Sequence, residues 1–248
     1  MSTQINAVLF DLDGTLRHSR PNGFETFVSF LAELGYPLSP EQFKDGHRWV
    51  HYYWTVSPEL LADMRELGDE TPAFWRRHTE RQLRAVGIEH FPEALPDQLG
   101  KFFDERFRPV HHVPADVLPT LKRLREQGYA VALVSNRNHP LGELCSELGL
   151  DGCFDFTLSA GEADSFKPDP GIFLKALALA HATPETAVYV GDNYYADVVG
   201  ARAAGLRPIL IDPLGLFPNA GCDTIRTLGE VLGVLARLEG EPAAQPAN

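Results

Sequence analysis

Five short segments of the chain carry residue types that together could perform phosphoryl transfer with a magnesium ion. They are Asp11-Leu12-Asp13-Gly14-Thr15, Ser135-Asn136, Lys167-Pro168, Gly191-Asp192 and, five residues later, Asp197. Aspartates can act as nucleophiles and as magnesium ligands, while a hydroxyl and a lysine can bind phosphoryl oxygens. Each segment alone is weak evidence, because such pairs occur by chance at strand ends and turns. Their order, and their place after apolar runs, carries the inference.

The first segment supplies two carboxylates. Asp11 is placed to attack phosphorus and form an aspartyl phosphate. Asp13 could protonate the leaving oxygen and later deprotonate water, but an aspartate has an ordinary pKa of about 3.9. We therefore expect burial or the neighbouring Asp11 to raise the pKa of Asp13. Gly14 permits a tight turn. Thr15 can anchor that turn through its hydroxyl, and we expect it to support the site from outside the ligand set. The other interpretation of this segment is an ordinary exit from a strand.

The last two segments offer further oxygen ligands. Asp192 suits Mg²⁺, which prefers a few carboxylates together with water and substrate phosphate. Asp197 falls in the first turn of the next predicted helix. There it could orient metal-bound water or Lys167 from outside the ligand set, or only interact favourably with the helix dipole. Both interpretations remain open at this stage.

The middle segments predict a cradle for the phosphoryl group. The Ser135 hydroxyl and the backbone N–H groups of Asn136 and Arg137 can donate to phosphoryl oxygens. Lys167 would neutralise charge shared by the aspartyl and phosphoryl groups. Alone, Ser-Asn is more often a turn or cap, and a lysine beside a turn is usually solvated. Asp169 and Pro170 predict the start of a helix, as N-cap and first helical residue.

Apolar runs and helical periodicity predict the elements that position these residues. Buried parallel strands are expected over 5–10, 129–134, 187–190 and 208–211, with shorter ones at 154–158 and 223–226. Helices are expected between them, over 115–127, 141–148, 169–181 and 195–204. This alternation indicates a doubly wound parallel α/β sheet. Because ligands bind beyond the carboxyl ends of such strands, one pocket should gather Asp11, Ser135 and Asp192.

A block from Arg17 to His112 has a different pattern, helical throughout and without a convincing strand. It holds the three tryptophans Trp49, Trp54 and Trp75, and its expected helices are 24–34, 40–54, 58–67, 72–86 and 93–107. We therefore expect a catalytic core formed by 1–16 and 113–238, a separate helical cap domain at 17–112, and a disordered tail at 239–248.

Composition limits the partners. The net charge of −12 argues against wrapping a nucleic acid, since that affinity comes from clustered Lys and Arg. Three cysteines without paired spacing suggest neither a disulfide framework nor a zinc site, which favours a reducing, cytoplasmic compartment. Because no basic stretch precedes the first apolar run and no apolar run is long enough to cross a bilayer, we expect neither a leader nor a membrane span. The expected partner is a small phosphorylated metabolite.

The ordered motifs resemble those of the haloacid dehalogenase superfamily of hydrolases, and the resemblance covers nearly the whole chain. It implies a Rossmann-like core with a helical cap inserted after the first motif. It further implies that Asp11 is the nucleophile, that Asp13 is the acid and base, and that Ser135 and Lys167 bind the phosphoryl group. Mg²⁺ would then be held by Asp11, the Asp13 carbonyl and Asp192.

Within this superfamily the second aspartate narrows the activity. Halide-removing and phosphonate-cleaving members lack it, so Asp13 favours a magnesium-dependent phosphatase for a small phosphate monoester. The cap lysines Lys44 and Lys101 leave a phosphonate-cleaving enzyme as a residual alternative, because such members use a cap lysine as a Schiff base. A sugar-phosphate mutase, which keeps the same four motifs, is the main alternative, and a catalytically silent binding protein is another. Specificity would come from the cap. The candidate substrate contacts are His18, Arg20, Arg48, His51 and Tyr52.

Overall fold

The computed structural model describes residues 4–55 and 57–240, and the chain divides into two compact units. One unit combines Met1–His18 with His112–Asn248, and the other is Ser19–His111. The predicted tail at 239–248 lies outside the described residues except for its first two positions. Of these, Glu239 directly follows the helix Val231–Leu238 and accepts a hydrogen bond from the Tyr129 hydroxyl.

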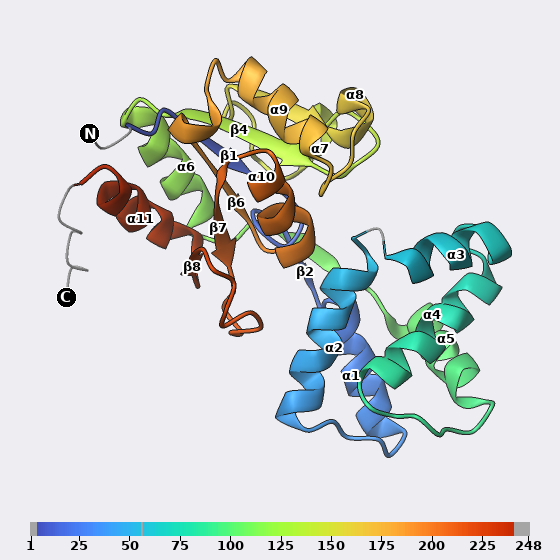
Figure 1. Ribbon diagram of the computed structural model, residues 1–248. Coiled ribbons are helices and arrows are strands. Elements are labelled where there is room, and N and C mark those ends of the chain that lie inside the picture. Colours follow the sequence, from blue (N-terminus) through green and yellow to red (C-terminus); the bar gives the residue numbers. More distant parts are fainter. Residues whose placement is uncertain (1–3, 56, 241–248) are drawn as a thin grey trace. The chain divides into compact units, whose positions relative to one another are not determined.

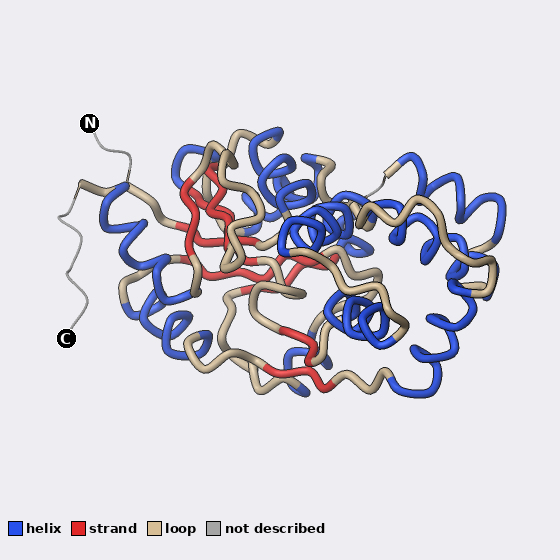
Figure 2. Tube along the Cα trace, turned by 90° about the horizontal axis from the view of Figure 1, so that it is seen from below, coloured by secondary structure: helices blue, strands red, loops and turns tan. Residues whose placement is uncertain are grey.

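The first unit is built on one six-stranded sheet in the order β5-β4-β1-β6-β7-β8, with every neighbouring pair parallel (Figures 1 and 2). The bounds are β1 Ala7–Phe10, β4 Ala130–Ser135, β5 Phe156–Ser159, β6 Ala187–Gly191, β7 Arg207–Ile211 and β8 Asp223–Ile225. The central strands are short apolar runs, which suit a sheet covered on both faces. The predicted doubly wound α/β fold is therefore confirmed.

Helices cover both faces of this sheet (Figure 1). On one face pack α6 Val117–Glu126, α7 Gly142–Glu147 and α11 Val231–Leu238; on the other pack α9 Pro170–Leu179 and α10 Val199–Ala203. Side chains of β1 alternate between these two cores, with Val8 and Phe10 in the first and Ala7 and Leu9 in the second. The short α8 Ala160–Ala163 and the C-terminal α11 were not among the predicted helices.

In its described residues, the second unit contains five helices: α1 Gly23–Glu33, α2 Pro40–Tyr53, α3 Pro58–Leu67, α4 Pro72–Ala85 and α5 Leu95–Arg106. The first four begin at a capping side chain, namely Asn22, Ser39, Ser57 and Thr71. Each such cap satisfies an N–H group that the first turn leaves without a helical partner. Phenylalanine and leucine side chains of α1, α4 and α5 form the largest apolar cluster of this unit.

The expectation that 17–112 contains no strand is wrong. β2 His18–Arg20 and β3 Val110–His112 form a two-stranded sheet, and the Ser19 hydroxyl and the His111 Nδ1 lie 2.9 Å apart across it. Each strand has only three residues, mostly polar, so neither offers an alternating apolar pattern that a sequence could reveal. The two strands pair across about ninety residues of sequence, and only the folded chain brings them together.

Among the described residues, no helix has both the length and the apolar character that crossing a bilayer requires.

Candidate active site

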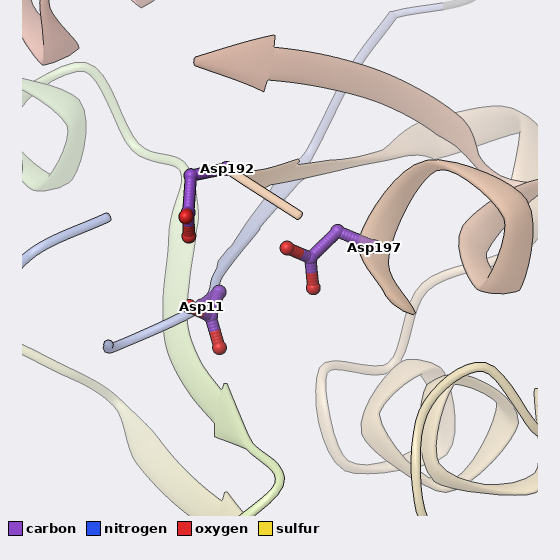
Figure 3. A group of neighbouring side chains, drawn as sticks. All are labelled: Asp11, Asp192 and Asp197. Atoms are coloured by element: carbon purple, nitrogen blue, oxygen red, sulfur yellow. The ribbon is translucent and has the colours of Figure 1, made fainter. Parts of the chain in front are cut away.

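Three aspartates converge at the carboxyl edge of the sheet. Asp11 directly follows β1, Asp192 directly follows β6, and Asp197 lies one turn further along the chain. One carboxylate oxygen from each lies within 4.8 Å of the others (Figure 3). The Asp11 N–H donates to the Val190 carbonyl at 2.9 Å, which ties the end of β1 to β6. The parallel sheet therefore produces the cluster of carboxylates expected for a cation.

Lys167 is buried at the centre of this cluster. Only 2% of its surface is exposed, and its ammonium donates to Asp11 at 2.6 Å, to Asp197 at 2.7 Å and to the Tyr189 hydroxyl at 2.9 Å. Burial by itself would lower the pKa of Lys167, but Asp11 and Asp197 raise it well above its ordinary value. Lys167 is therefore a fixed positive charge beside Asp11.

One lysine does not neutralise three carboxylates. Burial, together with the charge of Asp197, raises the pKa of Asp11 to about 7 even though Lys167 opposes the shift. Burial and then the charges of Asp11 and Asp197 raise the pKa of Asp192 well above its ordinary value. With all three carboxylates ionised, the buried cluster would carry excess negative charge, and its hard oxygen donors are those that Mg²⁺ prefers. The donor set fits the ion implied by the sequence.

Two glycines allow the loops to approach these carboxylates. Gly14 has a φ of 93°, and a Cβ atom there would collide with the Asp192 carboxylate. A Cβ atom at Gly191 would collide with the Asp197 carboxylate in the same way. Thr15, expected as a supporting residue outside the ligand set, donates its hydroxyl to Asp192 Oδ1 at 3.0 Å. This hydrogen bond holds the Asp192 carboxylate beside the turn.

Asp197 uses both of its oxygens. One accepts from Lys167, and the other accepts from the Asn193 N–H at 2.9 Å. The predicted helix at 195–204 is in fact a π-helical turn, η2 Tyr194–Val198, followed by α10. The Asn193 side chain caps this turn by accepting from the N–H groups of Tyr195 and Ala196. The wide turn directs Asp197 back into the cluster, where it orients Lys167.

Two of the phosphoryl-binding candidates, Ser135 and Asn136, differ in whether their side chains already have a hydrogen-bond partner. Ser135 is 2% exposed, and its hydroxyl has no hydrogen-bond partner within the described part of the chain, so it is available to an incoming oxygen. The Asn136 side chain, by contrast, is engaged. It accepts from the Lys167 N–H at 2.7 Å and donates to the Lys167 carbonyl at 2.9 Å. Asn136 therefore fixes the backbone that carries Lys167. Asp169 caps α9 as predicted.

Asp13 differs from its expectation. Its carboxylate pairs with Arg137, at 2.8 Å to Nε and 3.0 Å to Nη2, and also with Arg17 Nη1. Burial acts to raise the pKa of Asp13, but these two arginines outweigh it and lower the pKa. The expected upward shift is therefore wrong for this arrangement, because the two arginines outweigh burial and the neighbouring carboxylate.

Two residues of the site, Tyr189 and Arg17, were not among the predicted ones. Tyr189 binds the Lys167 ammonium and donates its own hydroxyl to the Val134 carbonyl at 3.0 Å. The sequence contained one indication of this role, because Tyr189 places a hydroxyl within the otherwise aliphatic run of β6 and a buried hydroxyl needs a hydrogen-bond partner. Arg17 gave no comparable signal, because an arginine after a turn is usually solvated.

The candidate substrate contacts lie on β2 and α2. His18 packs near the His112 ring, with centroids 5.8 Å apart, and Arg20 is exposed. On α2, Arg48 pairs with Glu41 and Asp45 of its own helix, and the Tyr52 hydroxyl donates to Glu59 at 3.4 Å. His51 accepts from the Thr55 hydroxyl through its carbonyl. The assignment of these residues to substrate binding remains a prediction.

We expect Asp192→Asn to stabilise the magnesium-free protein at neutral pH and to remove its response to Mg²⁺. An aspartate with a raised native pKa binds more protons folded than unfolded, so its contribution to stability falls as the pH rises. In the wild type, magnesium at about 100 times its dissociation constant should add about 2.7 kcal/mol of stability. Thermal unfolding in EDTA and in MgCl₂ measures both effects.

The control for this experiment is Asp169→Asn, because asparagine caps a helix as well as aspartate does. It should keep the full magnesium response. If Mg²⁺ stabilises the Asp192→Asn protein as much as the wild type, Asp192 is not a magnesium ligand.

The chain belongs to the family of haloacid dehalogenase-like hydrolases, because the sequence model of that family matches residues 5–205. The buried lysine and carboxylates at the edge of the parallel sheet lie within this span.

Individual relatives agree with this membership. The chain is similar to human haloacid dehalogenase-like hydrolase domain-containing protein 3, with 44% identity over 222 residues, 87% of this chain and 85% of that protein. It is 31% identical to a glyceraldehyde 3-phosphate phosphatase of Methanopyrus kandleri, over 84% of each chain. Among solved structures, a 2-haloacid dehalogenase from Pseudomonas syringae pv. Tomato matches with 28% identity and a TM-score of 0.54, covering 94% of this chain and 99% of that one.

Proposed function

We propose that the chain is a magnesium-dependent phosphatase that hydrolyses a small phosphate monoester through an aspartyl phosphate on Asp11. The main support is the buried ammonium of Lys167, which lies 2.6 Å from Asp11 Oδ1 beside the other two carboxylates. A phosphate ester must bring negative charge next to a negative nucleophile, and a fixed cation there offsets the repulsion. The phosphatase relative from M. kandleri is a second line of support.

Asp11 begins the proposed reaction. Lys167 holds one carboxylate oxygen of Asp11, and the other attacks phosphorus. The new Asp11 O–P bond forms while the ester P–O bond breaks, and the leaving oxygen takes a proton from Asp13. Water then attacks the phosphorus of the aspartyl phosphate and gives a proton to Asp13. The Asp11 O–P bond breaks in this step, so that inorganic phosphate is released and Asp11 is restored.

The remaining residues of the site bind and orient the phosphoryl group. Ser135 donates its hydroxyl to a phosphoryl oxygen, while Asn136 and Asp197 keep Lys167 in place. Asp11, Asp192 and the Asp13 carbonyl are the proposed magnesium ligands, with Thr15 orienting Asp192. When bound, Mg²⁺ supplies charge neutralisation for the carboxylates and the phosphoryl oxygens.

The pairing of Asp13 with Arg137 gives the proposal a specific requirement. An ionised, ion-paired Asp13 donates no proton, so it must leave the arginine before it protonates the leaving oxygen. The incoming phosphate offers Arg137 an alternative anionic partner. The exchange of partners is a consequence of the proposed role of Asp13.

We expect Arg137→Ala to raise the pKa of Asp13 and to move the alkaline limb of the pH profile of kcat/KM to higher pH. Arg137 provides the largest influences that lower this pKa, and their loss leaves burial less opposed. A group that must be protonated then stays protonated to a higher pH. Steady-state kinetics across the pH range measure the shift.

Arg125→Ala is the matched control, because Arg125 pairs with Asp155 rather than Asp13. Its profile should follow the wild type. If the pH profiles of kcat/KM for Arg137→Ala and the wild type superimpose, Asp13 is not the acid.

The Ser19–His111 unit is proposed as the cap domain, and selectivity among phosphate esters is assigned to it. The three cysteines are free thiols, which supports a reducing, cytoplasmic location. The proposed partner is a small phosphorylated metabolite.

A panel of phosphate monoesters tests the function. It should include glyceraldehyde 3-phosphate, because one relative carries that name, and sugar phosphates. We expect release of inorganic phosphate that requires Mg²⁺ and stops in EDTA. In ¹⁸O-labelled water, a phosphatase incorporates labelled oxygen into the released phosphate, whereas a mutase returns an isomeric sugar phosphate with little labelled phosphate. Absence of turnover across the panel would instead support a silent binding protein.

A further inference from the structure

The Ser19–His111 unit contains a pocket made from residues that the proposed chemistry does not use. Its volume is about 900 Å³, within the roughly 300–1,000 Å³ typical of small-molecule sites. Its wall is formed by residues of α1, α4 and α5, by the residues directly after α2 and α5, and by Glu70 between α3 and α4. Five aromatic side chains line it: Phe24, Trp54, Trp75, Phe103 and Phe107. Such a wall favours a flat, apolar ligand.

The two tryptophans of the pocket are the least covered of its rings. Trp54 and Trp75 are each 43% exposed, and their ring centroids lie 5.9 Å apart. Trp49, in contrast, stacks on the buried Tyr53 at 4.7 Å. Covering an exposed indole is favourable, and two of them lining one pocket form an apolar surface larger than a single exposed side chain. They provide faces on which an aromatic ring can stack.

The charged side chains of the pocket wall determine which aromatic ligands fit it. The cations of the pocket wall are already engaged, since Arg76 pairs with Asp97 and Glu80, and Lys101 lies 3.8 Å from Glu105. Two carboxylates of the wall, those of Glu70 and Asp104, have no ion-pair partner among the residues that the structure describes. The uncompensated charge of the pocket is therefore negative, which repels an anionic ligand and attracts a cation.

His78 does not change this balance. It is 8% exposed, lines the pocket and packs 5.2 Å from Trp54 and 5.7 Å from Trp75. Burial lowers the pKa of His78 to about 4, so its ring adds no positive charge at neutral pH. Its Nε2 is buried without a hydrogen-bond partner in the described part of the chain. The pocket therefore combines indole faces, a neutral imidazole and free carboxylates.

We propose that this pocket binds an aromatic amine, a flat ring carrying a protonated amino group. The ring stacks on Trp54 and Trp75, and the ammonium group is attracted by their faces and by Glu70 and Asp104. A phosphate group is unsuited to this pocket, because its negative charge is repelled by the same two carboxylates. The site is independent of phosphate hydrolysis, and its test needs no turnover.

Three probes of matched shape test the proposal on the full-length protein. They are 2-phenylethylamine, 2-phenylethanol and phenylacetate, which are cationic, neutral and anionic at neutral pH. Isothermal titration calorimetry should give a dissociation constant of about 1 mM or tighter for the amine, as expected for a ligand of nine heavy atoms. The neutral alcohol should bind several-fold more weakly, and phenylacetate should not saturate the protein.

Two variants locate the binding. Trp75→Leu removes a half-exposed indole and should weaken the amine about tenfold. Asp104→Asn keeps the shape of the side chain and should reduce the preference for amine over alcohol about threefold. Glu126→Gln, an exposed charge change on α6, is the control and should bind like the wild type.

Three outcomes would overturn the proposal: no saturable binding of the amine, phenylacetate binding as tightly as the amine, or an amine affinity that neither Trp75→Leu nor Asp104→Asn changes. Loss of hydrolysis in Asp11→Asn leaves this binding unaffected, so the failure of one proposal is distinguishable from the failure of the other.

Discussion

Replacement of Asp11 by asparagine is expected to lower the rate of phosphate-ester hydrolysis at least about 10³-fold, because removal of a nucleophile abolishes the covalent route and not merely an orienting contact. Asparagine has nearly the same shape as aspartate and can still accept a hydrogen bond from Lys167 through its amide oxygen. The loss therefore reports on the nucleophile and not on a gap in the site. Phosphate release with the best ester of the panel is the measurement.

A second measurement separates covalent from direct hydrolysis. Wild-type protein mixed with a radiolabelled substrate and quenched in acid should retain label that hydroxylamine removes, as an acyl phosphate requires. The Asp11→Asn protein should retain none. Asp169→Asn, a replacement of the same kind at the cap of α9, should keep both the activity and the label. If Asp11→Asn hydrolyses the ester at a rate comparable to the wild type, Asp11 is not the nucleophile.

Replacement of Lys167 by methionine is expected to have the largest effect on stability. The change leaves Asp11 and Asp197 buried without their common counter-ion, and breaking a buried pair in this way costs about 3–5 kcal/mol. Hydrolysis should also fall, by about 10²-fold or more, since the fixed charge beside the phosphoryl group is lost. Chemical unfolding and the phosphatase assay measure these two losses separately.

The stability loss in Lys167→Met should depend on pH. The pKa of Asp11 in the native wild type is about 7, and the loss of Lys167 removes an influence that lowers it. Protonated carboxylates need no counter-ion, so the difference from the wild type should be large at about pH 7 and shrink towards about pH 4, near the ordinary pKa of an aspartate.

Two comparison variants sharpen this prediction. Lys167→Arg keeps a positive charge and should retain more stability than Lys167→Met at neutral pH. Lys122→Met, at a side chain that is 77% exposed, should match the wild type in both assays. A Lys167→Met protein as stable as the wild type at neutral pH would mean that the two carboxylates do not depend on the lysine.

The Asp192 and Lys167 replacements act in opposite directions on the same cluster. Replacing Asp192 removes a carboxyl group whose ionisation the buried cluster disfavours, whereas replacing the lysine removes the counter-ion of the carboxylates that remain. The site therefore gives up stability for function, which is typical of residues that must bind a charged ligand. A comparison of both variants in EDTA would measure this balance directly.

Much of the core followed from local sequence. The apolar runs that became β1, β4, β6 and β7 are short and rich in β-branched residues, and each was placed within two residues of its observed bounds. The parallel sheet then brought Asp11, Ser135 and Asp192 to one edge, because parallel strands end on the same side. The helices of the second unit were also visible, since capping residues and prolines mark their starts.

Features that depend on contacts distant in sequence were not predicted. β2 and β3 lack a pattern of their own and exist because they pair with each other. Tyr189 was counted as part of an apolar strand, although its hydroxyl binds Lys167. Trp54 and Trp75 were noted only as tryptophans of the helical block, and the pocket that they line, with the unpaired carboxylates of its wall, was not predicted.

The sequence by itself determined which residues of this protein could perform the chemistry, because the order of Asp11, Ser135, Lys167 and Asp192 after predicted strands left few other arrangements. The protonation states were decided only by the tertiary structure. Asp13 was expected to have a raised pKa, and Arg137, 124 residues away in sequence, lowers it instead. A pKa depends on every charge within a few ångströms, and chain folding alone determines which charges those are.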